Sequence, residues 1–182
     1  MKTPVHAVAI KTFTGMLRTL STLLDKGVEH AAAKGIDPAE LVNARLSEDM
    51  YPLSRQVQIA CDMAKNSTAR ILGLEPPRFE DVEQTIDELK ARIAKTIDYL
   101  EGLPEAAFEG AETRDVVMPL MGTLVLEQTG FAHLRDWALP NFYFHVVTAY
   151  DILRHKGVEI GKRDFLASLA AGAIHDRGPA GA

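Results

Sequence analysis

Residues 82–100 read VEQTIDELKARIAKTIDYL, and this stretch has the most regular apolar pattern in the chain. Its apolar positions recur at steps of three and four; they are Val82, Ile86, Leu89, Ile93, Ile97 and Leu100. Such spacing places them on one face of an α-helix. The other faces are filled by charged residues, namely Asp87, Glu88, Lys90, Arg92 and Lys95. The stretch therefore predicts an amphipathic helix that begins near Val82 and ends before Gly102.

Helical spacing of apolar residues continues on both sides of this stretch. We expect a long helix from Val5 to about Gly35, and a second that opens at Pro52 and ends near Gly73. The last core helix should run from Pro140, a favourable first-turn proline, to His155 or Lys156. Between the first two, Asp37-Pro38 predicts a capped turn of helix through about Val42.

Residues 114–128 have a different pattern, with β-branched residues on either side of a turn. Val116 to Met118 and Leu124 to Leu126 flank this turn, which predicts a small β-hairpin. Pro119 cannot donate a ladder hydrogen bond, so it belongs at an edge or in the turn. Because an isolated hairpin is marginally stable, we expect this one to lie against the helices.

These elements predict an all-α fold, an up-down four-helix bundle with the hairpin inserted before the last core helix. The length of 182 residues fits one domain. We place this domain at residues 1–166. Residues 167–182 are expected to be a short helix, capped by Asp164 and ending near Leu169, or a frayed C-terminal tail.

Composition excludes several classes of protein. The net charge of −5, without any basic run, argues against nucleic-acid binding. No apolar run approaches the roughly 18 residues that span a bilayer, and no signal peptide is recognisable at the N-terminus. We therefore expect a soluble, cytoplasmic protein without membrane partners. Cys61 is the only cysteine, so it cannot form an intramolecular disulfide and is expected to pack as an apolar residue.

The last helix is unusually aromatic. Its rings crowd within nine residues; they are Phe142, Tyr143, Phe144, His145 and Tyr150. Four consecutive rings on a helix must point in different directions, so the segment is expected to be buried on most sides or to form a homodimer interface.

Two polar pairs are candidates for a site. Gln58 and Asp62 are four residues apart on the second long helix, and Asn141 and His145 are four apart on the last. The other histidines offer no metal-binding motif, and an Asn carbonyl is a poor ligand for zinc. His145 is therefore either a structural, hydrogen-bonded residue or a group that binds a ligand or transfers a proton.

Several stretches resemble a known bacterial family. They are residues 43–46 (NARL), 49–62 (DMYPLSRQVQIACD), 139–150 (LPNFYFHVVTAY), 152–157 (ILRHKG) and 161–166 (GKRDFL). The family is catalogued as domain of unknown function nineteen ninety-three, and the resemblance covers about Val5 to Leu166. It implies membership of the DinB/YfiT-like superfamily of helical bundles, of which many are regarded as metalloenzymes and some are metal-dependent thiol transferases or isomerases.

The resemblance also implies where a site would lie. The usual superfamily site takes one histidine from the second helix and two, four residues apart, from the last. Here the last helix offers Asn141 and His145, and the second offers Gln58 or Asp62, so two of three ligands are changed. The resemblance thus implies a polar pocket of Gln58, Asp62, Asn141, His145 and Tyr150.

Three hypotheses follow for the function. The leading one is a homodimeric bundle that holds a small ligand beside His145, with no cofactor expected. The second is a metal-dependent enzyme of the thiol-transferase or isomerase kind, with Asp62, Asn141 and His145 as an altered ligand set for a divalent metal. The third is a structural or partner-binding module, in which the polar residues form a satisfied core network.

Overall fold

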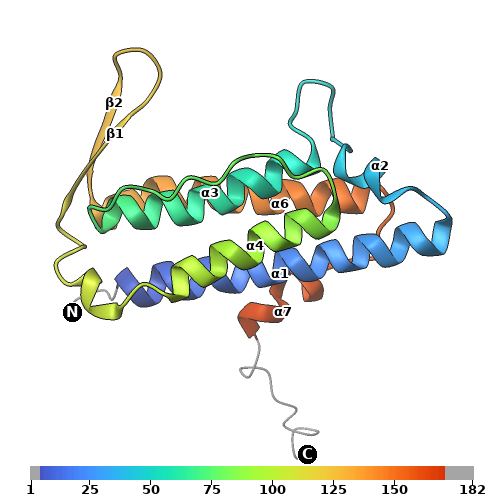
Figure 1. Cartoon of the computed structure of the whole chain (residues 1–182), viewed down its shortest axis with the longest axis horizontal. Coiled ribbons are helices and arrows are strands. Elements are labelled where there is room, and N and C mark those ends of the chain that lie inside the picture. Colours follow the sequence, from blue (N-terminus) through green and yellow to red (C-terminus); the bar gives the residue numbers. More distant parts are fainter. Residues whose placement is uncertain (1–4, 171–182) are drawn as a thin grey trace, which may run out of the picture.

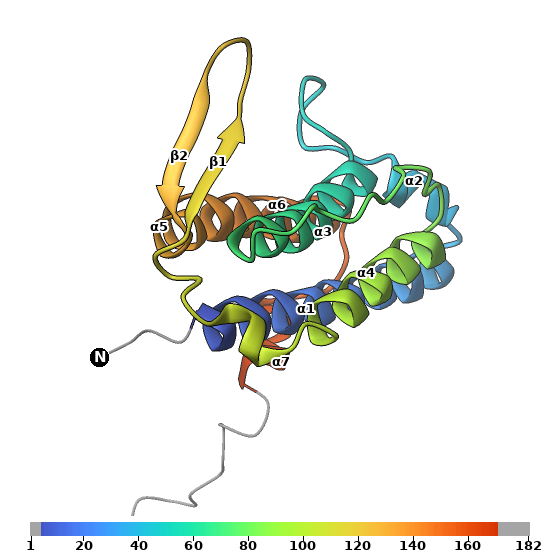
Figure 2. The ribbon, with the colours of Figure 1, turned by 60° about the vertical axis from the view of Figure 1, so that its left-hand side comes forward.

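The computed structural model describes residues 5–170, and four long helices form about half of it (Figure 1). They are α1 (Val5–Lys34), α3 (Leu53–Ile71), α4 (Ile86–Glu101) and α6 (Leu139–His155). Helix α3 packs on α6 and α4, while α1 packs on α4 and α6, and their buried faces share one hydrophobic core. Figures 1 and 2 show two layers, with α3 and α6 in one and α1 and α4 in the other.

Shorter elements connect and cover these helices. They are α2 (Pro38–Val42), the 3-10 helix η1 (Glu105–Phe108), β1 (Asp115–Pro119), β2 (Val125–Thr129), α5 (Gly130–Ala132), the π-helix η2 (His133–Ala138) and α7 (Lys162–Ala170). No helix within residues 5–170 is long and apolar enough to cross a membrane.

The predicted starts of the first helices are confirmed. Helix α1 begins at Val5 and is followed by Gly35 at a φ of 65°, a conformation that glycine adopts without strain. The Asp37 carboxylate accepts a hydrogen bond from the amide of Ala39 and so caps α2. Pro52 is the residue that precedes α3, which ends at Ile71.

Helix α4 begins later than its apolar pattern predicts. Thr85 is the N-cap residue of a capping box: its hydroxyl accepts a hydrogen bond from the Glu88 amide, and the Glu88 carboxylate accepts one from the Thr85 amide. Val82 therefore lies in the connector before the helix and is 66% exposed. The prediction of a start near Val82 was wrong, because the capping box, rather than the apolar spacing, fixes where the helix can begin.

The last core helix begins as predicted, because α6 starts at Leu139 and Pro140 lies in its first turn. Unlike the prediction, helical structure also precedes it without a break, since α5 and η2 lead directly into α6. A proline removes one helical hydrogen bond, and the wider π-helical turns directly before Pro140 are a common way to absorb such an interruption. The expected start at Pro140 and the expected end at His155 are therefore confirmed.

The hairpin has the predicted strands but not the predicted placement. β1 and β2 pair antiparallel, with Asp115 opposite Thr129 and Pro119 opposite Val125. The base of β1 contacts α3, whereas the strands and their turn extend away from the helices (Figures 1 and 2). Apolar side chains near the tip are consequently exposed, including Met121 at 85%.

Helix α7 follows the last core helix and packs on α1. The Asp164 carboxylate accepts a hydrogen bond from the Gly161 amide and pairs with Lys26 of α1 at 3.3 Å. The expected domain end at residue 166 falls inside this helix. Residues 171–182 of the expected tail lie outside the described residues.

Candidate functional site

His145 on α6 is held by a chain of hydrogen bonds from α3. Nδ1 of His145 lies 2.7 Å from Oε1 of Gln56, and Nε2 of Gln56 donates to the backbone carbonyl of Tyr51 at 3.1 Å. Because the Gln56 amide group is oriented by the Tyr51 carbonyl, its oxygen faces the imidazole. The imidazole must then donate from Nδ1, which leaves Nε2 as the nitrogen with a free lone pair.

The surroundings of His145 favour the neutral imidazole. Partial burial lowers the pKa of His145 from its ordinary value, and the nearby positive charge of Arg55 lowers it further. At neutral pH the side chain is therefore uncharged and Nε2 can accept a hydrogen bond.

The Phe144 ring lies next to this imidazole, and both it and the ring of Tyr51, whose carbonyl binds Gln56, are exposed. The Phe144 ring meets the His145 ring edge to face, with centroids 5.2 Å apart. The guanidinium of Arg55 lies 5.9 Å from the centroid of the Tyr51 ring. Phe144 is 59% exposed and Tyr51 is 58% exposed, so both rings remain available for contact with another molecule. We call Tyr51, Gln56, Phe144 and His145 the imidazole site.

Two of the predicted pocket residues have other partners. Nδ2 of Asn141 donates to the backbone carbonyl of Trp137 at 2.7 Å, one turn earlier in the same helical run. The Tyr150 ring packs edge to face on Phe165 of α7, with centroids 5.8 Å apart. Tyr150 thus anchors the C-terminal helix, and Asn141 satisfies a carbonyl within its own helix.

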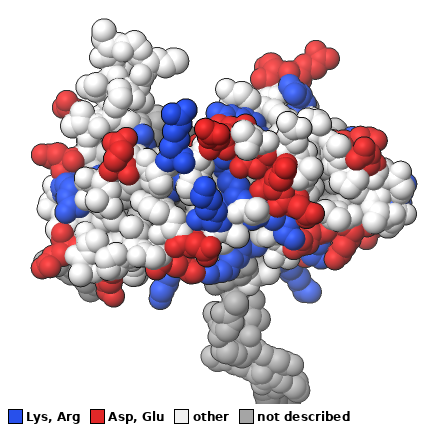
Figure 3. Space-filling model, in the orientation of Figure 1, with Lys and Arg blue, Asp and Glu red and all other residues white. Residues whose placement is uncertain are grey.

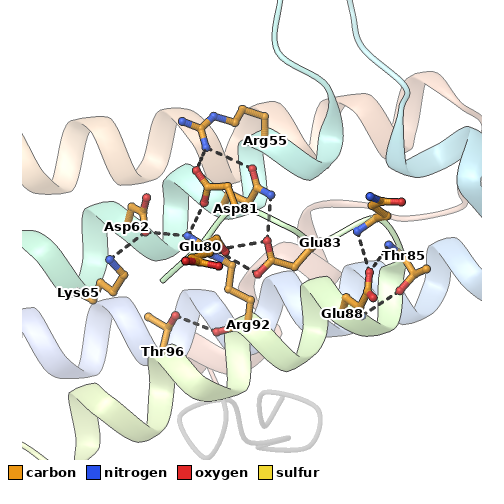
Figure 4. Close-up of polar contacts among 12 residues, drawn as sticks. Arg55, Asp62, Lys65, Glu80, Asp81, Glu83, Thr85, Glu88, Arg92 and Thr96 are labelled. Atoms are coloured by element: carbon orange, nitrogen blue, oxygen red, sulfur yellow. Dashed lines mark hydrogen bonds and ion pairs between the residues drawn. The ribbon is translucent and has the colours of Figure 1, made fainter. Parts of the chain in front are cut away.

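The other two, Gln58 and Asp62, belong to a charged network on the α4 side of α3 (Figure 4). Gln58 donates to Glu83 at 3.0 Å and accepts from Arg55 at 3.3 Å. Asp62 pairs with Arg92 at 2.9 Å and with Lys65 at 3.0 Å.

Arg92 is the centre of this network. Its guanidinium pairs with Asp62, Asp81 at 2.8 Å and Glu83 at 3.1 Å, and it also donates to the backbone carbonyl of Glu80. The side chain is only 1% exposed, although its charge predicted an outward position on the helix. A buried arginine surrounded by three carboxylates fastens the connector before α4 to α3 and α4. A structural role, holding these elements together, is enough to explain the Arg92 network.

No three His, Cys, Asp or Glu side chains in the described part of the chain are arranged so that they could hold a metal ion. Asp62, the proposed acidic ligand, is occupied by Arg92 and Lys65. Cys61 is fully buried, as predicted, and this burial raises the pKa of its thiol to about 12. It is therefore a packing residue and not a thiolate.

Sequence reasoning missed Gln56, the residue on α3 that actually meets His145. A signal was present, because Gln56 is three residues after Leu53 and four before Ala60, both of which are buried. A polar residue on a buried stripe needs a partner, and the facing helix supplies it. The prediction of Gln58 and Asp62 rested instead on their position at the border of the apolar face of α3.

Comparison with known proteins identifies the family. The family model described as "Domain of unknown function (DUF1993)" matches residues 5–166. A solved structure, of a DinB family member protein from Shewanella denitrificans, is 41% identical to this chain, with a TM-score of 0.84 and 96% of each chain covered. No curated protein matches this chain. With most of its length matched by the family model, the chain belongs to the DUF1993 family.

Proposed function

We propose that this protein binds a small neutral molecule at the imidazole site. The observation that supports this is the hydrogen-bond chain from Tyr51 through Gln56 to His145, which leaves Nε2 of a neutral imidazole as an acceptor. The exposed rings of Tyr51 and Phe144 would contact an apolar or aromatic part of the ligand. The ligand class is thus a hydrogen-bond donor attached to an apolar body.

We place this site on an up-down four-helix bundle of the DinB/YfiT type that works as a cytoplasmic homodimer. The four long helices and their shared core support the bundle. The exposed Val147 on α6 supports self-association through this helix. Sedimentation of the wild type and of Val147→Ser tests the dimer, which should weaken in the variant; a monomeric wild type contradicts it.

The tautomer of His145 is the first test. Ring nitrogen chemical shifts from NMR should show Nδ1–H at His145, whereas exposed histidines favour the Nε2–H form. Gln56→Leu removes the acceptor for Nδ1 and should return His145 to the ordinary tautomer mixture. His155, exposed at the end of the same helix, is the internal control. An Nε2–H form at His145 in the wild type contradicts the proposal.

Binding is tested with two matched probes. Phenol can donate to Nε2, whereas anisole has the same ring but no donor, so phenol should bind more tightly. The His145→Ala variant should lose this preference, and the matched control His155→Ala should keep it. Equal binding of the two probes by the wild type, or a preference that survives His145→Ala, would count against the proposed site.

The metal-dependent enzyme is the second candidate, and one observation favours it. Metal-binding histidines usually donate their other ring nitrogen to a fixed oxygen, as His145 does to Gln56. Elemental analysis of protein purified without chelator or histidine tag distinguishes the candidates. Near-stoichiometric metal that is lost in His145→Ala favours the enzyme and would justify thiol-transfer assays. Neutral-probe binding by metal-free protein favours the first proposal.

A further inference from the structure

A groove on another face of the molecule has the composition of a binding site. It has a volume of about 750 Å³ and lies between the second half of α3, the connector of residues 73–79 and strand β1. Figure 3 shows Lys and Arg side chains gathered in the middle of this face, next to the base of the hairpin, with acidic residues beside them. None of the imidazole-site residues lines this groove.

Arg70 lies in this groove and forms no ion pair with a carboxylate among the described residues. It is partly buried, and this burial lowers the pKa of its guanidinium. Within the described residues, its side chain makes no ion pair or hydrogen bond. Burying a charge without a partner is unfavourable, so a partner from solution would be stabilising.

Neighbouring donors lie along the same groove. The Asn66 side-chain oxygen accepts a hydrogen bond from Lys65 at 2.7 Å, which leaves the Asn66 amide nitrogen with its hydrogens available for a ligand. Arg78 also lines the groove and is exposed. Lys65 itself is balanced by Asp62 and is not counted among the free donors.

Apolar residues form another part of the wall. Pro76, Pro77, Phe79 and Val116 line the groove. The Phe79 ring is held in place by cations, with Nζ of Lys95 4.1 Å and Nζ of Lys65 4.9 Å from its centroid. A ligand with only a charge would leave these surfaces unused.

Acidic residues in the groove limit what it can bind. Glu75 and Asp115 line it, and the charge of Glu75 is close enough to act on Arg70. Neither forms an ion pair with Arg70 among the described residues. They disfavour a polyanion such as a nucleic acid, but they leave Arg70 free to pair with a single anionic group.

From these contacts we infer that this groove binds a small organic anion, whose carboxylate or phosphate group pairs with Arg70 and the Asn66 amide while its apolar part packs on Pro76 and Phe79. This site is separate from the imidazole site and does not depend on it. The protein then binds two classes of ligand: an organic anion in this groove, and the neutral hydrogen-bond donor proposed at His145.

Titration calorimetry with benzoate and phenyl phosphate tests the inference. At least one of these probes should bind, and benzyl alcohol, which has a ring but no charge, should bind at least about tenfold more weakly. Acetate and inorganic phosphate have the charge but no ring, and both should also bind more weakly. Backbone amide shifts of Gly73 and Val116 locate the binding in the groove.

Variants complete the test. Arg70→Gln keeps much of the side-chain length and should weaken binding of the tighter probe about tenfold. Because Arg70 makes no side-chain ion pair or hydrogen bond within residues 5–170, this variant should unfold at the same denaturant concentration as the wild type. Arg163→Gln, on the exposed start of α7, is the matched control and should bind normally. Binding of neither probe, binding unchanged by Arg70→Gln, or amide shifts elsewhere would overturn the inference.

Discussion

Arg92 and Asp62 form an ion pair of 2.9 Å that joins α4 to α3, with the arginine side chain almost completely buried. This pair explains why a carboxylate that seemed available for a ligand is not. It also predicts where the fold is most sensitive to loss of a charge.

Arg92→Met should be strongly destabilising. The substitution removes the cation that contacts Asp62, Asp81 and Glu83 together, and breaking a buried ion network costs about 3–5 kcal/mol. Urea unfolding measures the loss. Arg18→Met is the control, because Arg18 pairs with Glu101 at the surface, where such a pair contributes at most about 1 kcal/mol. Similar losses for the two variants would show that the Arg92 network is not structural.

Ile93→Ala tests the core of α4. Ile93 is 1% exposed, so deletion of its side chain should cost about 2–5 kcal/mol of unfolding free energy. Val82→Ala should cost little, because Val82 lies in the exposed connector before the helix. Denaturant titration of both variants measures these losses of unfolding free energy. A loss below about 1 kcal/mol for Ile93→Ala would mean that the core register of α4 is misassigned.

The buried His133 should make stability depend on pH. Both ring nitrogens lack a partner among the described residues, and burial, aided by the charge of Arg70, lowers the pKa of His133 to about 4 from 6.5. The unfolded chain therefore binds a proton at higher pH than the folded chain does. The contribution of neutral His133 is complete above pH 6.5 and is lost as pH falls towards about 4.

His133→Leu isolates this effect. Urea unfolding at a series of pH values should show a smaller loss of stability in the variant than in the wild type over this pH range. Above pH 6.5 the variant should be no less stable, because leucine has no unsatisfied polar atoms to bury. Parallel curves for the two proteins would contradict the assigned protonation state.

Gly130→Ala should also destabilise the fold. A Cβ atom at this position would lie 2.0 Å from the backbone oxygen of Ala111, which is far inside van der Waals contact. Relief requires movement of the backbone, so we expect a cost of at least about 1–3 kcal/mol. Gly161→Ala is the control, since its added atom meets nothing closer than 4.0 Å. Equal melting temperatures for the two variants would show that the segments around residues 111 and 130 separate easily.

Apolar periodicity made most of the helical elements predictable. The faces of α1, α3 and α4 are buried as their spacing indicated, because a helix with one apolar face must cover it. The caps at Asp37 and Gly35 were equally local signals. Thr85 and Glu88 would have given the start of α4, had the capping box been weighed above the apolar spacing.

The candidate site could not be predicted to the same degree. The spacing of Gln58 and Asp62 places them on one stripe of α3, but it does not identify their partners, which are Glu83 in the connector and Arg92 on α4. Which polar residue on α3 meets His145 depends on how α3 and α6 are rotated and shifted against each other. Periodicity defines a face, but it does not select the residue on the opposing helix.

The sequence by itself thus determined the helices, their apolar faces, the hairpin strands and the buried state of Cys61, because each depends on spacing along one element. Only the tertiary structure decided that Arg92 is buried, that Gln56 fixes the His145 tautomer, and that Arg70 lines a groove and forms no ion pair with the other described residues. These features depend on side chains that are distant in sequence. Their electrostatics arise only when packing removes water from between them.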